Sequence, residues 1–114
     1  MEVRQIPMAQ LRGIIDEQLA HGEALLPVTG NSMWPLLVGG RDMVRLARPD
    51  RRVQKGDIVL YQRADGSYIL HRVIRLCAPE TCICCGDAQW EGEQVDEAQI
   101  IAYVTAFRRK GHWQ

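Results

Sequence analysis

The sequence lacks any run of apolar residues approaching the ~20 that a transmembrane helix needs. Its first ten residues mix charged and apolar side chains and contain no apolar core of the kind found in a secretory signal. Linkers, low-complexity tracts and internal repeats are also missing. We therefore expect a soluble, cytoplasmic protein with one main domain, because 114 residues suffice for one domain and are too few for two ordinary ones.

An excess of charge of one sign is equally absent. The 14 Lys and Arg residues balance the 14 Asp and Glu residues, so the formal net charge is zero with neutral histidines. Since nucleic-acid-binding domains rely on a basic face, we expect no nucleic-acid partner. Basic residues do gather in segments 45–55 and 108–110. Such clusters are typical of solvated loops and tails, and the alternative is contact with a partner protein or an anionic membrane surface.

The cysteines follow neither of the common functional patterns. All four lie close together, at Cys77, Cys82, Cys84 and Cys85. Disulfide frameworks usually spread their cysteines along a secreted chain, and zinc sites usually pair C-x2-C units or combine Cys with His. We therefore expect reduced structural thiols, without metal or cofactor. Two alternatives are a Cys77–Cys82 cross-strand disulfide and a metal site assisted by His71 or His112.

Apolar residues recur at helical spacing near the start of the chain and predict a helix over residues 7–21. Pro7 suits its first turn, and Gly22 suits its end. Further on, short strand-like runs alternate with turn residues, and Asp65-Gly66 gives the clearest hairpin signal. The expected strands cover residues 24–29, 43–47, 57–62, 67–76, 81–85 and 100–107.

This pattern predicts an all-β fold with one helix in front of it. The β part would be a sandwich, a coiled sheet or an open barrel. We expect an N-terminal helical segment over residues 1–23, a β domain over residues 24–107 and a basic C-terminal tail over residues 108–114.

Three segments carry side chains suited to catalysis. Ser32 lies in the turn 30–35, directly after a predicted strand. The flexible Gly30 would let this turn aim the Ser32 N–H and Oγ at one point, as an oxyanion site requires. His71 is surrounded by apolar residues on a strand, and Asp87 presents a carboxylate in a turn. Each also has an ordinary structural interpretation, as a turn serine, a core histidine and a turn aspartate.

The sequence and order of these segments resemble the superfamily that joins type I signal peptidases with the self-cleaving repressors of the SOS response. The resemblance spans residues 28–104. The segments that carry it are Gly30-x-Ser32-Met33-x-Pro35, Gly40-Arg41-Asp42 (with one residue inserted), Lys55-Gly56-Asp57-Ile58-Val59, His71-Arg72-Val73, Gly86-Asp87 and a closing strand at 101–104.

This resemblance implies coiled β-sheets of the signal-peptidase and repressor type, with Ser32 as nucleophile and His71 as general base. Bacterial signal peptidases and the repressors typically use lysine as the base, whereas the archaeal and endoplasmic-reticulum type uses histidine, so His71 indicates the second branch. Histidine suits this role because it titrates at about 6.5 without the desolvation that lysine needs.

The resemblance also implies a carboxylate that supports the base. Asp87 is the first candidate, and Glu93 and Asp96 are the alternatives. We expect Asn31, Met33 and Pro35, which flank the nucleophile, to contact the substrate.

The expected function is a soluble serine endopeptidase that cleaves a peptide or a partner protein, with peripheral membrane attachment or an anchored partner as an option. The main alternative is a non-catalytic relative that binds an extended peptide in the same groove by strand addition. A DNA-binding repressor is disfavoured, because the chain has one predicted helix, no helix-turn-helix and no basic face.

Overall fold

The computed structural model describes residues 8–28 and 30–114, and it is mostly β with one α-helix in these ranges. The elements, in order, are α1 (Met8–Ala20), β1 (Glu23–Pro27), β2 (Met43–Ala47), β3 (Ile58–Gln62), β4 (Tyr68–Cys77), β5 (Thr81–Cys85), β6 (Glu93–Asp96), the 3-10 helix η1 (Glu97–Gln99), β7 (Ile100–Arg109) and β8 (His112–Trp113). The expected mostly-β character with a leading helix is confirmed.

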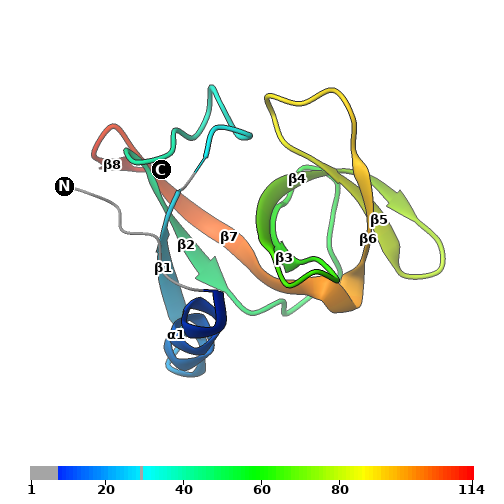
Figure 1. Cartoon of the computed structure of the whole chain (residues 1–114), viewed down its shortest axis with the longest axis horizontal. Coiled ribbons are helices and arrows are strands. Elements are labelled where there is room, and N and C mark those ends of the chain that lie inside the picture. The colour runs from blue at the N-terminus through cyan, green and yellow to red at the C-terminus, as the bar shows by residue number, and fades with distance from the viewer. Residues whose placement is uncertain (1–7, 29) are drawn as a thin grey trace.

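All strands within the described ranges belong to one eight-stranded antiparallel sheet, in the order β1-β2-β7-β3-β4-β5-β6, with β8 paired to β7. The long strand β7 connects two parts of this sheet, because one end pairs with β3 and the other with β2. Figure 1 shows α1 beside β1 at one side of the molecule, while β3 to β6 curl together at the other.

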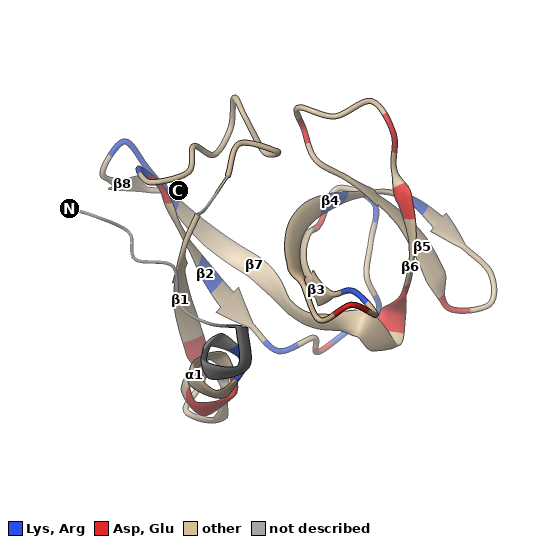
Figure 2. Cartoon of the chain, viewed as in Figure 1, with Lys and Arg blue, Asp and Glu red and all other residues tan. Residues whose placement is uncertain are grey.

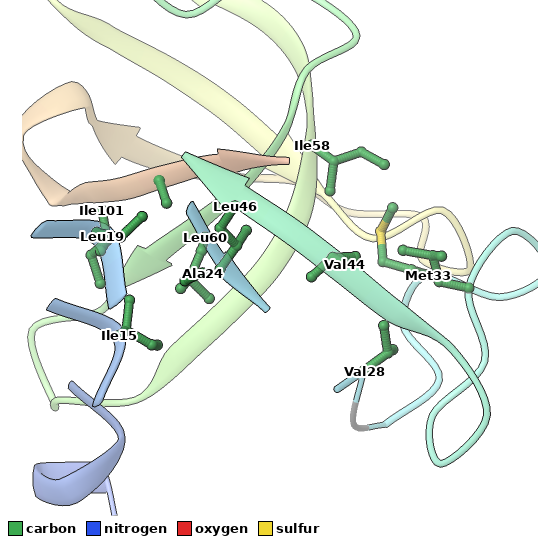
Figure 3. Close-up of a cluster of buried hydrophobic side chains, with 12 residues drawn as sticks. Ile15, Leu19, Ala24, Val28, Met33, Val44, Leu46, Ile58, Leu60 and Ile101 are labelled. Carbon is green, nitrogen blue, oxygen red and sulfur yellow. The ribbon is translucent and has the colours of Figure 1, made fainter. Parts of the chain in front are cut away.

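Each part of the sheet encloses its own apolar core. The first core joins α1 to the sheet: Ile15 and Leu19, one helical turn apart, are buried with Leu46 and Leu60 (Figure 3). The second core lies within the curl of β3 to β6. Its buried members are Val53, Val59, Tyr61, Val73, Cys82, Cys84, Val95, Ile100 and Tyr103. Tyr61 of this second core also belongs to the candidate site described below.

The C-terminal segment is part of the sheet, so the expected free basic tail over residues 108–114 is wrong. β7 continues to Arg109, and β8 folds back so that Arg108 pairs with Trp113. The turn between them has positive φ at Lys110 (53°) and Gly111 (83°), the conformation that two-residue hairpins favour. This segment has no apolar alternation from which a strand could be predicted.

Basic residues of segment 45–55 make contacts within the chain. Arg51 pairs with Asp57 at 2.9 Å, and Arg52 pairs with Glu97 at 3.1 Å. Figure 2 shows acidic and basic residues on both sides of the molecule, with acidic residues on β6 and basic residues at the β7–β8 turn. Within the part of the chain that the structure describes, no helix is both long and apolar enough to cross a bilayer.

Candidate functional site

Ser32 is held in the loop between β1 and β2 by apolar neighbours on its C-terminal side. Gly30 adopts a φ of 72°, a left-handed conformation that favours glycine. Met33 is only 2% exposed and packs in the first core, and its carbonyl accepts a hydrogen bond from the Leu37 N–H at 2.9 Å. Ser32 itself is half-buried, so its hydroxyl is held by an anchored turn while staying near the surface.

The loop after β5 supports the same serine from the other side. The Ala88 N–H donates to the Ser32 carbonyl at 2.8 Å. A Cβ on Gly86 would come within 2.5 Å of the Ser32 carbonyl oxygen and 2.9 Å of its Cβ. Residue 86 therefore has to be glycine for the two loops to approach this closely.

His71 lies on β4 and meets Ser32 across this junction. Its side chain is almost fully buried, with 4% of the residue exposed. The Nε2 atom is 3.2 Å from Ser32 Oγ, which is hydrogen-bonding distance. The structure thus brings together the two residues predicted to act as nucleophile and base, although they are separated by most of the β1–β4 sequence.

The other imidazole nitrogen faces a residue that the sequence analysis missed. Nδ1 of His71 lies 3.3 Å from the hydroxyl of Tyr61, which is fully buried on β3. Because Tyr61 pairs with Ile69, it is the diagonal neighbour of His71 on the same face of the hairpin. The two rings meet edge to face, with centroids 6.2 Å apart.

Behind Tyr61 lie two charged residues. The Tyr61 hydroxyl donates to the Glu93 carboxylate. Arg63 donates hydrogen bonds to the same carboxylate, with Nη2 2.7 Å from Oε1 and Nε 3.1 Å from both oxygens. Strands β3 and β6 are not neighbours in the sheet, so the Tyr61–Glu93 contact crosses the inside of the curl.

Burial and these contacts set the protonation states of the site. Burial lowers the pKa of His71 below its ordinary 6.5, outweighing the opposing effect of Glu93. Arg63 lowers the pKa of Glu93, while burial and the nearby Glu93 charge raise the pKa of Tyr61 far above its usual range. At neutral pH the site therefore holds a neutral imidazole, a neutral phenol and an ionised carboxylate.

Asp87 does not contact the imidazole, so the prediction that it supports His71 is wrong. Its carboxylate accepts hydrogen bonds from Arg72 Nε at 2.9 Å and Nη2 at 3.1 Å. Arg72 follows His71 on β4, and successive strand residues face opposite sides of the sheet. Of the two alternatives, Glu93 reaches the imidazole through Tyr61, whereas Asp96 is exposed and lies in the lining of a separate cavity.

The expected substrate contacts are only partly compatible with the structure. Asn31 and Pro35 are exposed on either side of Ser32. The Met33 side chain is buried in the first core, so the expectation that it binds substrate is wrong: it anchors the turn instead (Figure 3). Trp34, which was not predicted to take part, is 57% exposed beside the serine.

A cavity of about 610 Å³ lies elsewhere, between α1, the β3–β4 turn and η1. Arg12, Arg48 and Arg63 contribute to its lining, and Ser32 and His71 do not. The candidate catalytic pair lies outside this cavity, with Ser32 half-buried and His71 almost fully buried.

The four cysteines are free thiols in the structure. Cys82 and Cys84 are buried in the second core, with their sulfurs 3.8 Å apart, and Cys77 pairs with Thr81 rather than with Cys82. The Cys85 thiol lies within hydrogen-bonding distance of three carbonyl groups in the loop that supports Ser32, and its single proton can be donated to one of them. Among the described residues, no group of three or more His, Cys, Asp or Glu side chains is arranged to hold a metal ion.

No family model, curated protein or solved structure gives a significant match to this chain. The chemistry of the site is therefore inferred from its own side chains: an alcohol next to a buried neutral imidazole, whose far nitrogen faces a phenol that in turn bonds to a carboxylate.

Proposed function

We propose that this protein is a serine endopeptidase of the signal-peptidase type, with Ser32 as nucleophile and His71 as general base. The observation that carries the proposal is the 3.2 Å contact between Ser32 Oγ and Nε2 of a buried histidine whose pKa lies below 6.5. A base has to be unprotonated to accept a proton, and burial keeps this imidazole neutral at neutral pH.

The chemistry follows from this contact. Ser32 Oγ attacks the carbonyl carbon of the substrate peptide bond while its proton passes to His71 Nε2. The tetrahedral intermediate collapses as the imidazolium returns the proton to the departing amine, leaving an ester on Ser32. Water then attacks this ester with the same base, which releases the acid product and restores the hydroxyl. The Ser32 N–H is the expected donor to the oxyanion.

The substrate class we propose is an extended peptide or an exposed segment of a partner protein. The site is near the surface, and the exposed Asn31, Trp34 and Pro35 border the serine. Resemblance of the segments around Ser32, His71 and Gly86 to signal peptidases and self-cleaving repressors also supports this class. We further propose that the curled sheet has the form of those domains.

Cleavage of a diverse peptide library, read by mass spectrometry, tests the proposal. The chain offers a matched control, because its other serine, Ser67, bonds to Asp65 in the β3–β4 turn. We expect the unmodified protein and Ser67→Ala to cleave the same peptides and Ser32→Ala to cleave none of them. Binding of a peptide without cleavage by any of the three would instead favour the non-catalytic peptide binder.

A further inference from the structure

We propose that Tyr61 is a positioning residue that fixes the tautomer of His71, acting as a relay between the imidazole and Glu93. Its effect on catalysis rests on the proposed function, whereas its effect on the tautomer does not. Three hydrogen bonds in series carry the inference: Ser32 to His71, His71 to Tyr61 and Tyr61 to Glu93.

The direction of each bond follows from counting protons. The Tyr61 hydroxyl has one proton and lies within reach of both Glu93 and His71 Nδ1. An ionised carboxylate can only accept, so the phenolic proton is directed to Glu93. The Tyr61 oxygen can then only accept a hydrogen bond from His71, through one of its lone pairs. The Nδ1 atom must therefore carry a proton and donate it.

This assignment leaves the catalytic nitrogen free. A neutral imidazole carries one N–H, and a proton on Nδ1 leaves Nε2 with a lone pair that can accept a hydrogen bond. Nε2 is the atom that faces Ser32 Oγ at 3.2 Å. The relay thus selects the tautomer that can accept the Ser32 proton, the task that a direct carboxylate performs in a Ser-His-Asp triad.

Arg63 maintains the direction of these hydrogen bonds, from His71 to Tyr61 and from Tyr61 to Glu93. Its hydrogen bonds to both carboxylate oxygens hold Glu93 in the ionised form, which cannot donate back to Tyr61. Tyr61 is fully buried and stays protonated. The Tyr61 hydroxyl separates the imidazole from the Glu93 carboxylate, so the negative charge acts on His71 only at a distance. Burial therefore lowers the His71 pKa more than the Glu93 charge raises it.

The tautomer is measured directly by ¹H–¹⁵N NMR of the histidine side chains in the full chain at neutral pH. The exposed His21 and His112 serve as internal references, and His71→Gln assigns the His71 signals. We expect His71 to show a protonated Nδ1 and an unprotonated Nε2. The opposite pattern, with the proton on Nε2, would overturn the proposed relay.

Tyr61→Phe removes the hydroxyl and keeps the buried ring. We expect His71 to lose its single Nδ1–H tautomer and, on a cleaved peptide, kcat to fall about 10- to 100-fold with little change in KM. Tyr103→Phe is the matched control, since Tyr103 is also buried and its hydroxyl donates to the Arg51 carbonyl at 2.7 Å. Tyr103→Phe should change neither the His71 tautomer nor kcat. An unchanged His71 tautomer in Tyr61→Phe would overturn the role of Tyr61.

Glu93→Ala tests the same relay without changing the core. With the carboxylate gone, the Tyr61 proton is free to point to Nδ1, and we expect the His71 proton to move to Nε2. Glu91→Ala, in the preceding loop, should leave the tautomer as it was. Retention of the Nδ1–H tautomer in Glu93→Ala would contradict the relay. If cleavage is absent but the tautomers behave as described, the proposed function fails and the relay stands.

Discussion

His71 and Arg72 are neighbours on β4, yet one contacts Ser32 and the other contacts Asp87, at 3.2 Å and 2.9 Å respectively. Strand alternation explains the separation, because it directs the two side chains to opposite faces. One face of β4 therefore presents His71 for the proposed proton transfer. The opposite face presents Arg72, which attaches the loop that supports Ser32.

Asp87→Asn is accordingly expected to weaken the loop without changing the base. The Arg72–Asp87 pair is partly exposed, so we expect the free energy of unfolding to fall by less than about 1 kcal/mol. The His71 tautomer should match that of the unmodified protein. The limb of the pH–rate profile should move only slightly, toward lower pH, because Asp87 is the weakest of the charges that act on the His71 pKa. A loss of turnover by orders of magnitude, together with a shifted profile, would return Asp87 to the role of supporting carboxylate.

The cleavage rate should rise with pH and reach a plateau by neutral pH. Neutral imidazole is the active form, and burial lowers the His71 pKa, so the rising limb should lie below 6.5. Glu93 and Asp87 act on this pKa in the raising direction, and Arg63 acts in the lowering direction. A limb that appears only above about pH 8 would exclude His71 as the base, since the dominant effect of its surroundings lowers its pKa.

The same histidine contributes to acid sensitivity of the fold. Its pKa is lower in the folded chain than the ordinary 6.5 of the unfolded chain, so the folded state binds fewer protons. The stabilising contribution is therefore present above pH 6.5 and is lost as the pH falls through the folded pKa. Urea unfolding across this window should show a smaller pH dependence for His71→Gln than for the unmodified protein.

Gly86→Ala should damage the candidate site through backbone displacement. The added methyl group would lie 2.5 Å from the Ser32 carbonyl, and we expect a loss of about 1–3 kcal/mol in stability with a strong loss of cleavage. Gly13→Ala is the control, because nothing lies within 4 Å of its Cβ position in α1. That substitution should stabilise the helix by about 0.5–1 kcal/mol and leave cleavage unchanged. Normal activity in Gly86→Ala would show that the two loops can separate without consequence.

Asp42 is the buried charge that ties the Ser32 loop to the end of the sheet. Arg41 lowers the pKa of Asp42 to about 2, and the carboxylate also accepts the Val38 N–H at 2.8 Å and the Lys110 N–H at 3.2 Å. Its contribution is present above pH 3.8 and is lost as the pH falls toward 2. We expect Asp42→Asn to cost about 1–3 kcal/mol in urea unfolding at pH 7, and the exposed Asp50→Asn to cost nothing measurable. Equal stability of the two variants would contradict this role.

Much of the sheet could be predicted from local patterns. Strands 43–47 and 81–85 have the expected bounds, and Asp65-Gly66 marks the β3–β4 turn. The hairpin register, in which Gln62 pairs with Tyr68, places Tyr61 diagonally opposite His71. That register follows from the turn position, so the hairpin pattern was a signal that could have identified Tyr61 beforehand.

Glu93 could not be placed in this way. Strand β6 has a single buried apolar residue, Val95, among acidic and amide side chains that are poor strand formers. Its contact with Tyr61 arises only because the sheet curls and brings β6 across from β3. The Asp87 error had a different source: the β4–β5 hairpin does return the 86–88 loop to Ser32, but the Asp87 carboxylate meets β4 at Arg72, whose side chain takes the face opposite to that of His71.

The central claim is that Ser32 and His71 act as one unit, and a double-mutant cycle on kcat/KM tests it most directly. Residues that share one proton transfer lose their function together, so Ser32→Ala and His71→Gln should each lower the cleavage rate by about 10⁶-fold. The double variant should then be no worse than either single variant. Losses that multiply in the double variant, or substantial cleavage by Ser32→Ala, would contradict the proposed Ser32–His71 centre.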